Sequence, residues 1–542
     1  MIQDIQRQVM WNRLLAVVEE QAQTMIRTAF STTVREAGDL SAGIFDTAGR
    51  MLAQAVTGTP GHVNSMMESV GHFLHKFPAD TLQPGDHLIT NDPWLGTGHL
   101  HDLTVMTPAF HKGRLVALFA NTAHVIDVGG LGMGPEGRSV FEEGLYIPIV
   151  KCFEAGRPND TFFDFLRMGT RMPVELEGDV YSLCACNDAG IRRLSAMLEE
   201  FRLDGIGALA EFILNSSLRA TLAEIARLPR GRFEAEIWSD GYEAPLKLCA
   251  AMVVEKDHIA VDFGGTSGRS GRGINVPAAY TRAYAAFGIK CVVAPDIPNN
   301  TASLAPFRFS IPEGCILNAP RPSAVAVRHV VGQLLPDLMM SCLHQSVPDR
   351  VTAEGSSCLW NPPLRGGPIV VPGSSLPDFE VITFNSGGTG ARPTRDGLDG
   401  TAFPSGVRTM PVEATENVAP VVFWRKELRP GSAGVGRMRG GHGQVMEIGA
   451  ARDASFVCNA VFDRVGHPPR GREGGGDGAP GVVRLASGTV LPTKGYLVIP
   501  EGDHLVLELP GGGGFGPAAE RDPAALARDE TDGLLGAHDG VA

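Results

Sequence analysis

The chain has 542 residues, which is too many for one ordinary hydrophobic core, so we expect two to four domains. Its formal net charge is −13 and it has no basic cluster, which argues against nucleic acids and anionic membranes as partners. No run approaches the roughly 20 apolar residues that a membrane span needs.

The first predicted elements are a helix, a hairpin and a second helix. Residues 2–29 carry apolar side chains at a spacing near 3.6, and their scattered charges argue against a secretory signal. Residues 41–56 form two apolar stretches around a turn at 47–49 and predict a hairpin. Residues 63–77 place their apolar side chains on one helical face.

A strand and a second hairpin follow. The tripeptide Pro-Gly-Asp at 84–86 starts a strand, HLITND, over residues 87–92. Residues 103–110 and 114–125 are apolar stretches separated by the turn signal His-Lys-Gly at 111–113. This arrangement predicts a β-hairpin.

The middle of the chain alternates between helical and strand patterns. A long helical stretch is expected over residues 187–228. After Gly231 three strands are expected, at residues 232–238, 246–254 and 258–263. Helical patterns return at residues 277–293 and 323–345.

Glycine becomes more frequent after about residue 346, and short strands dominate there. The expected strands lie at 379–384, 418–424 and 504–509, and a polar helix is expected at 520–535. The glycine-rich stretches at 476–481 and 510–517 are expected to be loops within the fold.

Together these elements predict a mixed α/β, or α+β, fold with antiparallel hairpins and flanking helices. We divide it into an N-terminal metal-site domain (1–230), a central α/β domain (231–345) and a glycine-rich, strand-rich C-terminal domain (346–542). The nine cysteines are scattered and form no Cys-x-x-Cys pair, which indicates reduced thiols in a cytoplasmic protein.

Potential metal ligands gather on a glycine-hinged turn at residues 91–102, NDPWLGTGHLHD. A hairpin turn centred between residues 112 and 113 pairs residues whose numbers sum to about 225, so Asp102 is expected beside His124. His99 lies three residues before Asp102. Two imidazoles and a carboxylate suit a divalent ion such as zinc, manganese or iron, with positions left open for water or substrate.

A simpler interpretation of the same residues is that they satisfy only local backbone groups, as aspartate and histidine near glycine turns commonly do. His101 is left outside the ligand set, because side chains alternate along a strand. Asp127 either orients His124 or caps a loop. Asp92 is expected to form an Asx-type turn before proline.

The stretch NDPWLGTGHLHDLTVMTPAF (91–110), followed by AHVIDVGG (123–130), resembles the signature of the hydantoinase B/oxoprolinase family. Further stretches resemble that family in order along nearly the whole chain, including STTVREAGDLSAGIFDTAGRMLAQ (31–54), GHVNSMMESV (61–70), RMPVELEGDV (171–180), FNSGGTGARPTRDG (384–397) and LPGGGGFGP (509–517). Trp94 and His101 stand where the family usually has tyrosine and proline, which bears on the shape of the substrate pocket.

The resemblance implies a set of site residues. His99, Asp102 and His124 are implied as metal ligands, the same three that the hairpin argument selects, and Asp39 is implied as a fourth. His62 is implied at the substrate pocket, and the alternative is a histidine that is satisfied locally at a helix start.

The resemblance also implies a function, namely a metal-binding B-type subunit of an ATP-dependent enzyme that opens a cyclic amide or imide such as a hydantoin, 5-oxoproline or a lactam. The glycine-rich stretches at 264–273 and 439–444 lack the lysine of a GxxxxGK[ST] phosphate loop and are expected to be turns. ATP-Mg is therefore expected on an A-type partner in a hetero-oligomer.

Three alternatives to this function remain open. The chain could be a subunit of an ATP-dependent ketone carboxylase of the acetone or acetophenone type. It could be a non-catalytic structural subunit of such a complex, or a stand-alone metallohydrolase.

Overall fold

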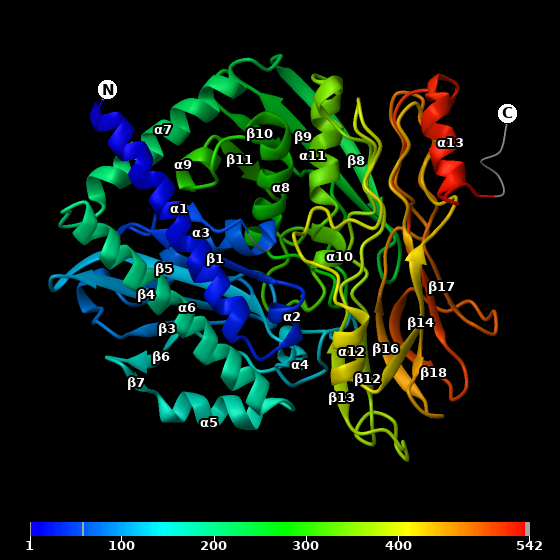
Figure 1. The fold of residues 1–542 in the computed structure, drawn as a ribbon, viewed down its shortest axis with the longest axis horizontal. Coiled ribbons are helices and arrows are strands. Elements are labelled where there is room, and N and C mark those ends of the chain that lie inside the picture. The colour runs from blue at the N-terminus through cyan, green and yellow to red at the C-terminus, as the bar shows by residue number, and fades with distance from the viewer. Residues whose placement is uncertain (1, 57–58, 537–542) are drawn as a thin grey trace.

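The computed structural model describes residues 2–56 and 59–536 (Figure 1). Helices accompany several largely antiparallel sheets, which confirms the predicted α+β class. In the described part of the chain, no helix combines the length and the apolar character needed to cross a bilayer.

The N-terminal part is built on one antiparallel seven-stranded sheet. Its spatial order is β2 (Met51–Gln54), β1 (Leu40–Phe45), β5 (Arg114–His124), β4 (Asp102–His111), β3 (His87–Thr90), β6 (Val150–Glu154) and β7 (Arg157–Pro158). The two predicted hairpins are confirmed as the pairs β1–β2 and β4–β5. Strands β6 and β7 were not predicted.

Helices cover both faces of this sheet, so its central strands are buried on both sides. The helices α1 (Ile2–Thr28) and α6 (Pro173–Glu200) share a hydrophobic cluster with Phe119 of β5. The helix α3 (Pro60–Lys76) packs on the opposite face, in a cluster that contains Leu118. The predictions of helices over 2–29 and 63–77 are therefore confirmed to within a few residues.

Two of the predicted helical stretches were partly wrong. The stretch 187–228 belongs to two helices, α6 and α7 (Gly207–Ile225), because the chain turns at Arg202, whose φ is 54°. The stretch 323–345 is helical only from residue 329, in α10 (His329–Gly332) and α11 (Leu335–His344). Before it, the amides of Val325 and Ala326 donate to the Glu143 carboxylate instead of to a helical carbonyl.

The central part contains a four-stranded sheet with α8 and α11 packed beside it. Its order is β11 (Phe307–Ser310), β10 (Ile259–Asp262), β9 (Leu246–Val254) and β8 (Gly231–Ser239), and only β10–β11 is parallel. The predicted strands β8, β9 and β10 and the predicted helix α8 (Ala278–Val293) are confirmed, whereas β11 was not predicted.

The C-terminal part contains two antiparallel four-stranded sheets, seen at the right of Figure 1. One has the order β13 (Phe379–Ile382), β12 (Pro363–Gly366), β16 (Phe456–Val461), β18 (Lys494–Ile499). The other has the order β14 (Val421–Leu428), β15 (Gln444–Ala450), β19 (Leu505–Glu508), β17 (Val482–Leu485). The three predicted strands fall on β13, β14 and β19, and the predicted terminal helix is shortened to α13 (Pro523–Thr531).

Short helices complete the described elements. They are α2 (Thr32–Arg35), α4 (Val140–Glu143), α5 (Asp160–Gly169), α9 (Thr301–Leu304) and α12 (Val412–Val418), with single 3-10 turns at Ala79–Thr81, Pro348–Arg350 and Ala518–Glu520.

Glycine-rich segments near residues 388, 440 and 512 pack main chain against main chain, and we call them the glycine seam. A Cβ atom on Gly512 would lie 1.9 Å from the carbonyl oxygen of Thr389. A Cβ atom on Gly440 would lie 1.9 Å from the carbonyl oxygen of Gly512. The high glycine content of this region thus reflects close backbone packing, and 510–517 is a loop within the fold as expected.

One hydrophobic cluster joins the central and C-terminal parts and contains Tyr284, Leu338, Trp360 and Phe456. The N-terminal sheet has its own clusters on its two faces. The domain boundaries at residues 230 and 345 stay a prediction.

Candidate metal centre

The ligand-rich turn lies where β4 begins and β5 ends. Asp102 opens β4 and pairs with His124, which closes β5, so the predicted register is confirmed. His124 Nδ1 lies 3.1 Å from Asp102 Oδ1, and His99 Nε2 lies 2.8 Å from the same oxygen. One possible ligand atom from each of these three residues falls within 4.8 Å of the others.

Asp39 and His62 lie against this group. Asp39 directly precedes β1, and its carbonyl oxygen accepts a hydrogen bond from the His124 amide at 3.0 Å. His62, in the first turn of α3, places Nε2 3.0 Å from Asp102 Oδ2 and Nδ1 3.6 Å from Asp39 Oδ1. His62 therefore bridges two carboxylates, which the alternative of a purely local histidine does not describe.

Four polar atoms of this group are buried and, among the residues that the structure describes, have no hydrogen-bond partner. They are Asp39 Oδ1, His62 Nδ1, His99 Nε2 and His124 Nε2. Buried polar atoms in folded proteins are nearly always partnered, so a cluster of unpartnered donors and acceptors requires an explanation.

The tautomer of His99 supplies that explanation. His99 Nδ1 donates to the carbonyl oxygen of Ala326 at 2.8 Å, while burial and the charge of Arg328 hold its pKa well below the usual value. The ring is therefore neutral, and Nε2 directs a lone pair at a carboxylate oxygen 2.8 Å away. Two acceptors at that distance repel each other unless a cation lies between them, and a backbone carbonyl behind the ring is typical of metal-binding histidines. The donor set fits a divalent ion.

Asp102 is held as a carboxylate by its surroundings. Burial acts to raise its pKa, but the nearby His62 and Arg328 hold the pKa well below its usual range. Oδ2 accepts hydrogen bonds from Thr97 Oγ1, at 2.7 Å, and from Arg328 Nη2. The Arg328 guanidinium also lies over the Tyr280 ring, 4.1 Å from its centroid.

Asp39 and His62 form a pair whose proton can move. Burial raises the pKa of the Asp39 carboxyl. For His62, burial acts to lower the pKa, but the nearby Asp102 and Asp39 carboxylates raise it above its ordinary value. A carboxyl and an imidazole that face each other in a buried site are suited to general acid–base chemistry.

A small cavity of about 30 Å³ lies among these side chains. It is large enough for an ion or one to two water molecules. Its lining comes from all three predicted domains: Asp39, Thr59, His62, His99, His124, Met133, Tyr280, Tyr284, Arg328, His329, Gln333, Leu359, Asn361, Phe384 and Ser405.

Several of these residues were missed from the sequence, notably Tyr280 and Tyr284 on α8 and Asn361 and Phe384 farther along the chain. They carry no recognisable spacing. Arg328 and His329 carry a faint signal, because they are the only charged or titratable residues within the run 324–335. Both are buried, and burial lowers the pKa of His329 to about 3.

The residues that the sequence analysis set aside are also located. The His101 ring stacks on His124 with centroids 5.6 Å apart, but it does not line the cavity. Asp127 accepts hydrogen bonds from the amides of Gly129 and Arg171 and so caps a loop. Asp92 forms the expected Asx-type turn, since its Oδ1 accepts from the Trp94 amide at 2.9 Å.

The glycine-rich stretches at 264–273 and 439–444 form turns, as expected. Their amides are used within the fold, as when Ser267 donates to the carbonyl oxygen of Lys247 and Gly441 to that of Thr389.

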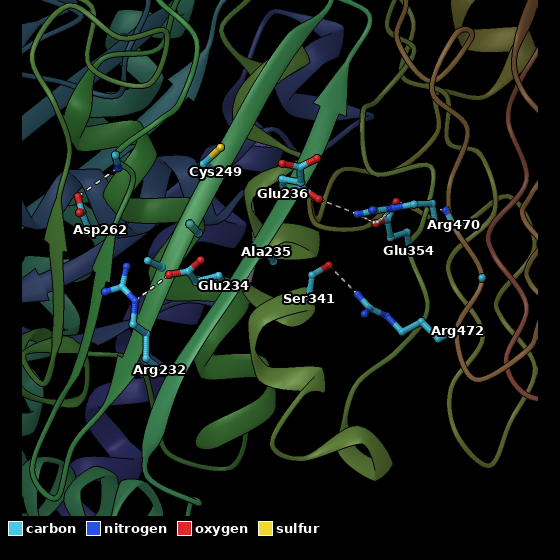
Figure 2. Close-up of a pocket in the computed structure, with 14 residues that line it drawn as sticks. Arg232, Glu234, Ala235, Glu236, Cys249, Asp262, Ser341, Glu354, Arg470 and Arg472 are labelled. Atoms are coloured by element: carbon cyan, nitrogen blue, oxygen red, sulfur yellow. Dashed lines mark hydrogen bonds and ion pairs between the residues drawn. The ribbon is translucent and has the colours of Figure 1, made fainter.

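A larger groove of about 660 Å³ lies elsewhere, across β8 and β9 (Figure 2). Arginine and glutamate side chains line it and pair with one another, as do Arg232 with Glu234, at 2.8 Å, and Arg470 with Glu354, at 2.7 Å. It has no histidine in its wall among the described residues.

The sequence was compared with protein-family models and with known proteins, and it is similar to members of one family along nearly its whole length. The family model described as Hydantoinase B/oxoprolinase matches residues 3–518. A protein named as the B-type subunit of a D-/L-hydantoinase, from Pseudomonas sp. (strain NS671), is 27% identical over 98% of this chain and 93% of its own length. The 5-oxoprolinase 1 of Arabidopsis thaliana is 29% identical over 94% of this chain, which spans only 42% of that longer protein.

Two solved structures share the fold. The ATP-dependent caprolactamase from Pseudomonas jessenii superposes with a TM-score of 0.90 at 23% identity, covering 98% of this chain and 94% of that one. A nucleotide-free acetone carboxylase structure superposes with a TM-score of 0.83 at 19% identity, covering 97% of this chain and 78% of that one.

Proposed function

The chain belongs to the hydantoinase B/oxoprolinase family, and we propose that it is the metal-binding, B-type subunit of an ATP-dependent enzyme that hydrolyses a cyclic amide or imide. The observation that carries the proposal is the buried cavity in which carboxylate and imidazole atoms face one another without hydrogen-bond partners in the described structure. His99, Asp102 and His124 would hold a zinc, manganese or iron ion, and Asp39 would complete the set.

A divalent ion at this position supplies a Lewis acid that polarises the carbonyl of a ring amide. The chain's own residues then act on protons. His62 accepts a proton from the attacking water, whose oxygen bonds to the carbonyl carbon, and returns a proton to the ring nitrogen as the C–N bond breaks. The Tyr284 hydroxyl lines the cavity close to Tyr280 and Gln333, and it can donate a hydrogen bond to the carbonyl oxygen.

Arg328 has a supporting role in this scheme. It keeps Asp102 ionised and fixes the turn that carries His99, since its Nε donates to the carbonyl oxygen of Thr97 at 2.8 Å. The side chains that line the cavity are all buried, which limits the access of bulk water to the reacting bond.

ATP would be handled by another chain. The sequence lacks a GxxxxGK[ST] loop, and the relatives include a B-type hydantoinase chain and a caprolactamase that is ATP-dependent by name. An A-type, ATP-Mg-binding subunit in a hetero-oligomer is therefore part of the proposal, as is a cytoplasmic location. The nine cysteines all lie in described residues, and none of them forms a disulfide.

A second candidate function is ketone carboxylation, which the likeness to acetone carboxylase favours. The same cavity would then stabilise an enolate oxygen. A purely structural subunit is a poorer account, because unpartnered buried carboxylate and imidazole atoms of the described chain gather around this one cavity.

The test is elemental analysis of the purified chain with its partner, beside His124→Ala and the matched control His101→Ala. We expect about one divalent ion per chain in the wild type and in His101→Ala, and its loss in His124→Ala. Ring opening of lactams and hydantoins with ATP is measured on the same samples, with ketone carboxylation as the competing assay. A wild type that takes up no zinc, manganese or iron after repletion would contradict the proposal.

A further inference from the structure

A second pocket adjoins the metal cavity. It has a volume of about 730 Å³, and it shares Thr59 and Ser405 with the cavity. Helices α3 and α8 and the segments 295–299 and 403–406 supply most of its wall. Nothing in the metal site described above uses this space.

One face of α8 runs from the cavity into the pocket. Tyr280 and Tyr284 line the cavity, and Phe287 and Cys291 line the pocket. Their spacing of four, three and four residues places them on one helical face. At 1.5 Å per residue, Tyr284 and Cys291 are about 10 Å apart along the helix axis.

Helix α3 borders the same two spaces. His62 lines the cavity, while Val63 and Asn64 line the pocket. Asn64 Nδ2 donates to the carbonyl oxygen of Ala283 at 3.0 Å and so joins α3 to α8. A Cβ atom on Gly61 would lie 2.4 Å from the Tyr280 ring and 2.7 Å from the Tyr284 ring, so glycine is needed for this close approach.

The junction between the two spaces is narrow and polar. Thr59 and Ser405, both buried, are its shared wall. The Tyr284 side chain is fully buried on the cavity side, and its hydroxyl lies close to Tyr280 and Gln333 without a well-formed hydrogen bond to either. A hydroxyl so placed at the junction can turn to a ligand that enters from the pocket.

The pocket itself is largely apolar. Phe287 and Phe403 form an aromatic pair with centroids 5.9 Å apart, and Ile297 and prolines extend that wall. Its charged lining consists of Lys290 and Asp296, with no arginine. The Lys290 ammonium already donates to the carbonyl oxygens of Ala294, at 2.9 Å, and Ile297.

We propose that this pocket is the chamber through which an uncharged cyclic amide or imide reaches the metal cavity. The ring lies against Phe287 and Phe403, and the amide points to Thr59, Ser405 and Tyr284. The chamber proposal rests on the proposed function. It adds one property of the substrate, namely that its ring carries no carboxylate. A carboxylate in this chamber would lose its hydration without gaining a guanidinium partner.

The experiment measures binding of two named probes to the full complex, ε-caprolactam and the anionic 5-oxoproline, by saturation-transfer NMR, together with KM and metal content. Cys291→Phe fills the chamber, and Cys249→Phe makes the same change in the open groove of Figure 2. We expect Cys291→Phe to weaken caprolactam binding at least about 10-fold with metal content unchanged, and Cys249→Phe to alter it less than about 2-fold.

A second variant keeps the test decisive if Cys291→Phe does not fold. Phe287→Ala enlarges the chamber, and we expect it to shift the preference for an eight-membered over a seven-membered lactam by about 5-fold. Unchanged binding and unchanged ring-size preference in the variants would contradict the proposal that this pocket binds the substrate. Tighter binding of 5-oxoproline than of caprolactam would contradict the proposal that the substrate carries no carboxylate. A wild type that binds caprolactam in a Cys291-dependent way yet holds no metal would overturn the proposed function and support the chamber.

Discussion

The closed cavity at the start of β4 and the open groove across β8 and β9 treat charge in opposite ways. The groove is about 660 Å³ in volume, and its arginines and glutamates pair with one another, at the surface for Arg232 and Glu234 and over a buried carboxylate for Arg470 and Glu354 (Figure 2). The cavity is about 30 Å³, and its imidazoles and carboxylates are buried with atoms left unpartnered in the described chain. Chemistry is marked here by unsatisfied polar atoms and not by the size of a hollow.

The largest expected effect separates the two regions directly. Asp102→Asn removes the carboxylate that three imidazoles and Arg328 share. We expect loss of the bound metal, a fall in activity of about 1,000-fold and a loss of about 3 kcal/mol in unfolding free energy, because Arg328 stays buried without its partner. Metal analysis and denaturant titration measure these changes. Glu234→Gln in the groove is the control. Equal effects of the two variants would contradict the claim that the cavity, and not the groove, holds the metal.

A second prediction concerns pH and Glu143, whose side chain holds the segment that leads into Arg328. Burial raises the pKa of Glu143 to about 8, and its Oε1 accepts from the amides of Val325 and Ala326. The folded state therefore binds a proton that the unfolded state, with a pKa near 4.5, releases first. The stabilisation is full below about pH 4.5 and is lost as the pH rises through about 8, amounting to a few kcal/mol.

Glu143→Gln tests this in the metal-free protein. The amide keeps an acceptor for both backbone donors and cannot ionise, so the decline of unfolding free energy between pH 5 and 8 should flatten. Denaturant titrations at several pH values measure the slope. An unchanged slope would mean that Glu143 is not the group responsible.

A third, smaller effect is expected at Tyr284. Tyr284→Phe removes only a hydroxyl, so we expect kcat to fall about 10-fold with KM and metal content nearly unchanged. Steady-state kinetics separate the two constants. A rise in KM with kcat intact would instead make the hydroxyl a binding group for the substrate.

The smallest effect is expected in the groove. Arg232 and Glu234 are 58% and 67% exposed, so their ion pair is worth at most about 1 kcal/mol. Arg232→Met should change Tm by no more than a few degrees and leave metal content unaltered. A large loss of activity in Arg232→Met would show that the groove takes part in the reaction, which its paired charges do not indicate.

The candidate site was predictable where local geometry decides it. A tight turn sets the register of a hairpin, so the pairing of Asp102 with His124 followed from the spacing alone. Arg328 and Tyr284 were not predictable in this way, because tertiary packing brings them from more than 150 residues away. The expected helix over 323–345 was wrong at its start because the Glu143 carboxylate takes the amides of 325 and 326, a contact that helical periodicity does not register.

The glycine seam has a consequence for how such proteins diverge. At Gly440 and Gly512 the facing main chains leave no volume for a methyl group. A side chain there would push whole loops apart, and no neighbouring substitution could make room by shrinking, because the obstructing atoms are backbone. In this half of the molecule the strands and the surface can therefore accept substitutions that the seam cannot accept one position at a time.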